Sequence, residues 1–194
     1  MGEDKAWLTL GGRPMIEHVL AAAQPVVDRL AVVINASNPK AEAYRHLAAR
    51  WDAEVLHDLH EHRGPLGGIH TALVNCGAGE SALVLACDLP FLTSEFLAWL
   101  CQKHQSGAAQ ATVPLDQSNR LQPLVAVYDR SCLPAIEEML ATDQLKVDRL
   151  YERITTQFIE LGESDCPTTD ERLFSNLNSP EDYQSAIRRA PPRK

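Results

Sequence analysis

The sequence is poor in basic residues, and this shortage limits its partners. It holds 18 Lys and Arg against 26 Asp and Glu, a formal net charge of −8 at pH 7. Because nucleic acids and anionic membranes are bound through basic surfaces, this balance argues against both as partners. The basic residues at 188–194 are interrupted by two prolines, and we interpret them as a frayed, solvated tail.

Long apolar runs and paired cysteines are also lacking. No apolar stretch approaches the roughly 18 residues of a membrane span, and the first five residues do not resemble a signal peptide. The five cysteines are widely spread without C-x-x-C spacing, so we expect structural thiols. These absences predict a cytoplasmic protein. With 45% hydrophobic residues, residues 1–194 are expected to form a single domain.

Short apolar runs alternate with helical patterns along nearly the whole chain. This order predicts an α/β fold, with a mostly parallel sheet buried on both faces. We expect strands at 30–34, 54–57, 82–86, 109–113, 124–128 and 155–160, and helices at 14–23, 40–50, 67–75, 94–104, 133–141, 145–153 and 180–189. Ligands of such sheets bind beyond the carboxyl ends of the strands, so the loops that follow strands should carry the chemistry.

One acidic residue, Asp88, follows the predicted strand at 82–86 and precedes Leu89-Pro90. Mg²⁺ in proteins takes one or two carboxylates together with substrate phosphate oxygens, so a lone acid at a strand end suits a nucleotide-bound metal. Acids before turns are common, however, and Asp88 would serve equally well as a cap of the next turn. The residues alone leave both interpretations open.

Three further positions follow predicted strands. Gly67, in Gly64-Pro65-Leu66-Gly67-Gly68, would let backbone N–H groups approach an anion or a base at a helix start, although an ordinary glycine turn has the same pattern. Asn35 and Asp58 each follow an apolar run and offer either turn caps or acceptors for the N–H donors of guanine.

Histidines gather near Asp58, at positions 57, 60, 62 and 70. A zinc site of the H-E-x-x-H type is not favoured, because Gly64 stands where the second histidine would fall. Exposed loop histidines are the expected alternative.

Several motifs resemble those of a known enzyme family. Residues 1–6 and Gly12-Arg13-Pro14-Met15 are similar to the second half of the nucleotidyltransferase signature L-A-G-G-x-S-x-R-M-G-x-D-K-A, then G-[RK]-P-[LM]. Further landmarks follow in the family's order: Val33-Ile34-Asn35, Val55-Leu56-His57-Asp58, Gly64-Pro65-Leu66-Gly67-Gly68, Cys87-Asp88-Leu89-Pro90-Phe91, Gln122-Pro123-Leu124 and Asn176-Leu177-Asn178-Ser179-Pro180-Glu181-Asp182. Because the order extends over nearly the whole chain, the sequence resembles the molybdenum cofactor guanylyltransferases.

This resemblance implies a three-layer α/β/α Rossmann-like fold and a specific reaction. The reaction is transfer of GMP from GTP to the phosphate of molybdopterin, or molybdenum cofactor, with release of pyrophosphate and with Mg²⁺ as cofactor. Lys5 would neutralise charge on the triphosphate, while Asp88 would hold Mg²⁺ with Asn178 as a second contact.

The resemblance also assigns the two substrates. Asn35 and Asp58 would select guanine, and Gly67 belongs to the same nucleotide site. Three residues, Arg120, Gln122 and Pro123, lie where the family receives the pterin. Molybdoenzymes or their chaperones would be the partners that receive the product.

The match begins inside the signature, which is a departure from the family. Met1 falls where the family has the methionine of R-M-G, so the preceding apolar strand, the L-A-G-G loop and the arginine do not stand in this sequence. We expect in-frame codons upstream of Met1 to encode them, and an open place in the sheet without them. A chain without that segment is expected to be a weak or inactive enzyme.

Two other functions remain open at this stage. One is a related cytidylyltransferase that acts on a cofactor or a sugar-alcohol phosphate, and the other is a nucleotide-binding or partner-binding relic without activity. Base selectivity separates the first from a guanylyltransferase, and a relic is marked by no response to any nucleotide.

Overall fold

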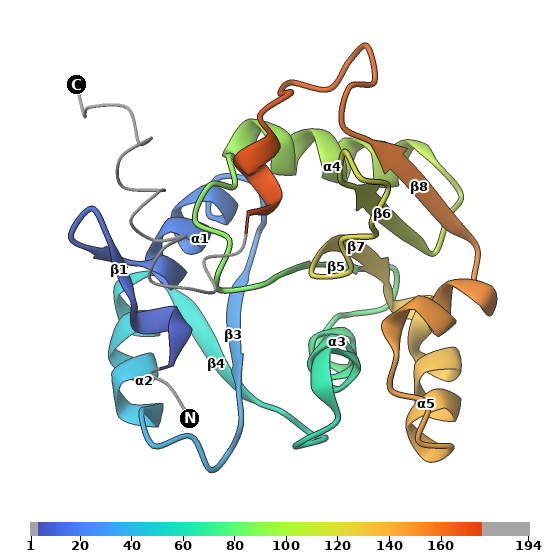
Figure 1. Cartoon of the computed structure of the whole chain (residues 1–194). Coiled ribbons are helices and arrows are strands. Elements are labelled where there is room, and N and C mark those ends of the chain that lie inside the picture. Colours follow the sequence, from blue (N-terminus) through green and yellow to red (C-terminus); the bar gives the residue numbers. More distant parts are fainter. Residues whose placement is uncertain (1–3, 176–194) are drawn as a thin grey trace.

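A computed structural model describes residues 4–175 and shows helices on both faces of a mixed sheet (Figure 1). The strands are β1 Thr9–Leu10, β2 Arg13–Pro14, β3 Leu30–Ile34, β4 Ala53–His57, β5 Ser81–Leu85, β6 Ala111–Leu115, β7 Val125–Asp129 and β8 Thr156–Glu160. The α-helices are α1 Met15–Ala23, α2 Ala41–Arg50, α3 Gly64–Val74, α4 Ser94–Ser106 and α5 Leu133–Ala141. Short 3-10 helices occupy η1 Lys5–Trp7, η2 Arg130–Cys132, η3 Val147–Glu152 and η4 Glu171–Phe174.

The strand directions confirm the predicted α/β class. In the larger sheet the order is β5-β7-β6-β8, with β7 antiparallel to β5 and to β6, and with β6 parallel to β8. It follows that β5, β6 and β8 point the same way and β7 alone is reversed. A separate parallel pair is formed by β3 and β4, in a register that places Ile34 opposite His57.

The reversed strand β7 lies at the centre of the core and separates its two sides. Val125 and Val127 pack with α1 and α4, whereas the alternate residues Ala126 and Tyr128 pack with α3 and α5. All four side chains are at most 3% exposed. Since successive residues of a strand face opposite sides of the sheet, this alternation produces the three layers.

The sheet is divided between β3 and β5. Immediately before these strands, the Arg29 guanidinium and the Glu80 carboxylate form an ion pair at 2.7 Å, and Leu30 packs in the same apolar cluster as Leu83 and Leu85. The amino ends of β3 and β5 therefore lie side by side. Within residues 4–175, however, no strand pairs with the remaining edge of either one.

Three elements differ from the sequence-based expectation. Helix α3 begins at Gly64, earlier than expected, because Pro65 is tolerated in the first helical turn, where its missing N–H costs nothing. The helix expected at 145–153 is the 3-10 helix η3. The hairpin of β1 and β2 was not expected, since strands of two residues are too short to show an alternation of apolar and polar residues. Its turn consists of Gly11 and Gly12, whose positive φ angles of 59° and 80° favour glycine.

Some predictions fall outside the described residues: Asn178, the helix expected at 180–189 and the tail at 188–194. Among the helices of residues 4–175, none has the length and apolar character needed to cross a membrane.

Candidate active site

Two of the predicted nucleotide-binding residues meet at the carboxyl ends of β3 and β4. Asn35 directly follows β3 and is exposed, whereas Asp58 directly follows β4 and is half-buried. The Asp58 backbone N–H donates to the Ile34 carbonyl at 2.8 Å, which continues the parallel pairing of the two strands by one step. Both side chains are therefore placed at the same edge, as the sequence predicts.

The Asp58 carboxylate is held by the loop that follows it and by α3. Its Oδ1 accepts the His60 N–H at 2.9 Å and the Thr71 hydroxyl at 3.3 Å. Gly67 makes this approach possible, since a Cβ there would lie 2.9 Å from the His60 carbonyl oxygen and 3.2 Å from Asp58 Oδ1. Gly67 is buried in the first turn of α3, near the helix start where the sequence places it, and it brings the helix up to Asp58.

Lys5 and Asp88 form the second group of this edge. Lys5 Nζ lies 3.8 Å from Asp88 Oδ2, with the two side chains 45% and 18% exposed. Asp4 anchors the 3-10 helix that carries Lys5, because its carboxylate accepts the Ala6 N–H at 3.2 Å and the Tyr44 hydroxyl from α2 at 2.8 Å. Burial and the hydrogen bond to Asp4 raise the pKa of Tyr44, so the phenol stays a donor.

Cys87 precedes Asp88 and is not a nucleophile at neutral pH. Burial, followed by the charges of Asp88 and Asp4, raises the pKa of the Cys87 thiol to about 11. All five cysteines carry free thiols, as expected for structural residues.

The predicted pterin-binding residues lie in the loop between β6 and β7, which Asp116 organises. Asp116 Oδ1 accepts the N–H groups of Ser118 and Arg120 at 2.8 and 3.0 Å. Its Oδ2 accepts from Arg120 Nε at 2.8 Å and from Gln122 Nε2 at 3.3 Å. Burial alone would raise the pKa of Asp116, but the hydrogen bonds from Arg120 and Ser118 outweigh it and lower that pKa.

Sequence reasoning missed Asp116, although its place two residues before a serine in a turn is a recognised signal.

This loop joins the same edge as Asp88. The Leu124 carbonyl accepts the Ala86 N–H at 2.8 Å, so the segment Gln122-Pro123 runs beside the chain that leads from β5 to Asp88. The Tyr128 hydroxyl fixes the segment further by donating to the Pro123 carbonyl at 2.9 Å. The end of the sheet at which β3, β4 and β5 finish therefore carries three groups: Asn35 with Asp58, Lys5 with Asp88, and Arg120 with Gln122 and Pro123.

The chemistry of these donors suits a metal ion shared with a substrate. Within the described range, no group of three or more His, Cys, Asp or Glu side chains is arranged to hold a metal ion. Asp88 offers one accessible carboxylate beside a lysine, as in sites where phosphate oxygens and water complete the coordination of Mg²⁺. The residues present therefore fit a nucleotide-bound Mg²⁺ and not a cage built from protein alone.

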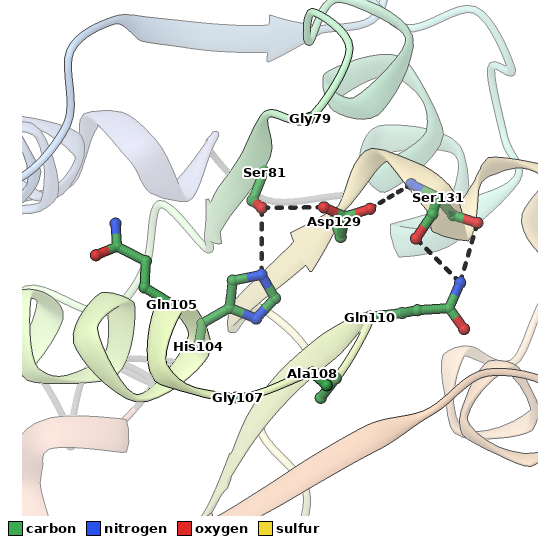
Figure 2. A pocket seen from close by; sticks show the side chains of 10 residues that line it. Gly79, Ser81, His104, Gln105, Gly107, Ala108, Gln110, Asp129 and Ser131 are labelled. Atoms are coloured by element: carbon green, nitrogen blue, oxygen red, sulfur yellow. Dashed lines mark hydrogen bonds between the residues drawn. The ribbon is translucent and has the colours of Figure 1, made fainter.

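A cavity of about 420 Å³ lies at the opposite edge of the sheet (Figure 2). Ser81, the first residue of β5, and Asp129, the last of the reversed β7, line it together with His104. Ser81 Oγ lies 3.2 Å from His104 Nε2 and donates to Asp129 Oδ2 at 3.5 Å. These polar groups are paired with one another, so we interpret them as a structural network that joins α4 to the sheet.

This network should make stability depend on pH. His104 is 8% exposed, and burial lowers its pKa below the 6.5 of an ordinary histidine. As pH falls below about 6.5, the unfolded chain takes up the proton before the folded one does, so the stabilisation present above that pH is lost. We expect a falling free energy of unfolding from pH 7 to 5 in urea titrations.

The His104→Gln variant tests the source of this pH dependence. It should show a shallower fall than the unchanged protein, although not a flat line, because burial also lowers the pKa of His70. The matched control is His46→Gln, since the His46 side chain is 80% exposed. Equal slopes in all three proteins would contradict the role of His104.

Comparison with known proteins agrees with this architecture. An α/β/α fold with a lysine and an acid beyond the strand ends is typical of nucleotide-binding domains. Residues 1–157 match the model of the MobA-like NTP transferase domain, and the chain belongs to this family of nucleotidyltransferases.

Curated relatives span most of the chain. It is 35% identical over 187 residues to a probable molybdenum cofactor guanylyltransferase of Pelotomaculum thermopropionicum, covering 96% of this chain and 85% of that protein. A second, from Methanothermobacter thermautotrophicus, carries the same description and is 34% identical, with coverages of 95% and 91%.

Solved structures are similar as well. The molybdopterin-guanine dinucleotide biosynthesis protein A of Archaeoglobus fulgidus superimposes with a TM-score of 0.80 at 27% identity, covering 96% of this chain and 90% of that one. The 4-diphosphocytidyl-2C-methyl-D-erythritol synthase of Anaerococcus prevotii, at 16% identity and a TM-score of 0.64, shares the fold alone.

Proposed function

We propose that this protein is a molybdenum cofactor guanylyltransferase. It transfers GMP from GTP to the terminal phosphate of molybdopterin or of the molybdenum cofactor. A cofactor phosphate oxygen forms a bond to the α-phosphorus of GTP, the bond from that phosphorus to the α–β bridging oxygen breaks, and the electron pair leaves with pyrophosphate. The observation that supports this most strongly is the set of three groups that this chain brings to one end of the sheet. It agrees with the 35% identity to a relative described as a probable molybdenum cofactor guanylyltransferase.

Lys5 and Asp88 would serve the phosphates. The Lys5 side chain is 45% exposed, and its ammonium would face the triphosphate, while Asp88 would hold Mg²⁺ with Asn178 as the second contact. When bound, Mg²⁺ neutralises charge on the phosphate oxygens and on the departing pyrophosphate. Because phosphoryl transfer asks for positioning more than for covalent chemistry, these two charged side chains would act by orienting the phosphates and neutralising their charge.

Asn35 and Asp58 would recognise the base, with Gly67 bringing α3 close behind Asp58. Both side chains offer oxygen acceptors, and guanine carries an exocyclic amine that donates, whereas adenine presents no donor at that position. Within residues 4–175, the hydrogen bonds that the Asp58 side chain accepts end on Oδ1, which would leave Oδ2 for the base.

Arg120, Gln122 and Pro123 would receive the pterin substrate. Arg120 adds a positive charge suited to the cofactor's phosphate, and its side chain is 77% exposed although it pairs with Asp116. The position of Gln122 and Pro123 beside the segment leading to Asp88 would bring the attacking phosphate next to the bound nucleotide.

Nucleotide preference tests the proposal directly. We expect pyrophosphate release from GTP with Mg²⁺ and molybdenum cofactor at a rate at least about tenfold above that with CTP or ATP, since one well-placed polar contact discriminates by this order. A reaction without the cofactor is the control. GTP alone of the three nucleotides should also raise the melting temperature.

Two results would replace the proposal with another function. Equal rates with CTP would indicate a cytidylyltransferase. No release and no thermal shift with any nucleotide would indicate a relic.

A further inference from the structure

Helix α3 turns one face towards the loop that carries Asp58. Gly67, His70 and Thr71 lie on this face, at the i, i+3 and i+4 spacing that brings side chains together on a helix. Gly67 admits the His60 carbonyl, and the His70 ring meets the His60 ring edge-on with centroids 4.7 Å apart. The loop is therefore fixed to α3 by two contacts at His60, directly after Asp58 and Leu59.

Thr71 makes the polar part of this connection. It is 1% exposed, and its Oγ1 accepts the Leu59 N–H at 3.0 Å and donates to Asp58 Oδ1 at 3.3 Å. A hydroxyl has one proton and two lone pairs, so it satisfies both partners at once. No other amino acid of the same size and shape offers this combination, since valine lacks the oxygen.

We propose that Thr71 is a positioning residue for base selection, because it holds Asp58 Oδ1 and so turns Oδ2 towards guanine. This inference rests on the proposed function, in which Asp58 binds the base. Without the hydroxyl, Oδ1 keeps the hydrogen bond from the His60 N–H but loses the one from Thr71, and the carboxylate gains rotational freedom. The loss should then fall on guanine recognition and not on phosphoryl transfer itself.

Thr71→Val tests this role with little change in volume. We expect KM for GTP to rise about tenfold with kcat within about twofold, the pattern of lost ground-state binding. Inosine triphosphate lacks the exocyclic amine, so its KM should change less and the preference for GTP over inosine triphosphate should shrink. Thr71→Ser keeps a hydroxyl and should restore the preference.

Thr112→Val is the matched control, because Thr112 is a second buried threonine, 0% exposed, whose hydroxyl lies 3.0 Å from His104 Nδ1. It should lower the melting temperature without changing the ratio between the two nucleotides. A cycle with Asp58→Asn adds a second check, since Thr71→Val should have no further effect on the ratio once the carboxylate is gone.

The outcomes separate the two claims. If the unchanged protein prefers GTP and Thr71→Val keeps the full preference, the role of Thr71 is overturned while the proposed function stands. If the unchanged protein shows no preference for GTP over CTP, both are overturned. If it prefers GTP over CTP but not over inosine triphosphate, the role of Thr71 alone is overturned. Should Thr71→Val not fold, Thr71→Ala provides the same comparison.

Discussion

Replacing Asp88 with alanine is expected to lower kcat for GMP transfer about 10³-fold or more, the order lost when a group that stabilises transition-state charge is removed. The melting temperature should change by less than about 2 °C, because this half-buried carboxylate lies beyond the strand end and contributes charge more than packing. Lys5, which faces it at 3.8 Å, is 45% exposed and stays hydrated in the variant.

The measurement is pyrophosphate release over a range of Mg²⁺ concentrations, with thermal melting of the same samples. Asp28→Ala is the control, since Asp28 is an exposed acid that precedes β3 and so lies at the opposite end of that strand from the site. Asp28→Ala should keep the full rate. Wild-type turnover of Asp88→Ala at saturating Mg²⁺ would remove Asp88 from the reaction.

The residues that the sequence predicted best are those that directly follow strands. Asn35 and Asp58 come after short apolar runs, and the parallel pairing of β3 and β4 necessarily brings such positions to one edge. Asp88 was placed by the same rule. In each case the prediction needs only the strand's end and direction, which a continuous apolar run indicates.

The features that sequence reasoning missed depend on contacts between distant segments. Thr71 meets Asp58 only because α3 folds back onto the loop after β4, and a threonine inside a helix carries no sign of this in its sequence neighbourhood. Gly67 was predicted at a helix start, but its contact with the loop was not predicted. Glycine weakens helices, and α3 contains it because a Cβ there would meet the His60 carbonyl. Packing therefore overrides local propensity at this position.

A second large effect, on stability and on affinity for GTP, is expected from adding a strand between β3 and β5. The facing edges of these strands have no strand partner within residues 4–175, and Val32, Leu83 and Leu85 are only half-buried there. An additional apolar strand parallel to both would pair both edges and cover these side chains. A following glycine-rich loop would bring consecutive N–H groups to the phosphate site at Lys5 and Asp88, because it would lead directly into that segment.

We therefore expect higher stability and tighter GTP binding in a chain extended before Met1 by an apolar strand and a loop of the pattern L-A-G-G-x-S-x-R. Burying even two aliphatic side chains contributes about 2 kcal/mol or more, which corresponds to a rise in melting temperature of roughly 5 °C. Affinity for GTP should rise at least about tenfold, since one hydrogen bond to a charged phosphate is worth that much. Calorimetry and GTP titration measure both.

The control extension keeps the glycine-rich loop but replaces the apolar strand by Gly and Ser of equal length. It should raise neither quantity, because the loop is held at the phosphates only when the strand is fixed between β3 and β5. Stability and GTP affinity should therefore rise together, and only in the chain whose extension contains the apolar strand. A rise in affinity without a rise in stability would indicate an added tail that binds nucleotide but does not pair with the sheet. Equal melting and equal affinity in the two extended chains would show that the edges of β3 and β5 do not take up a strand.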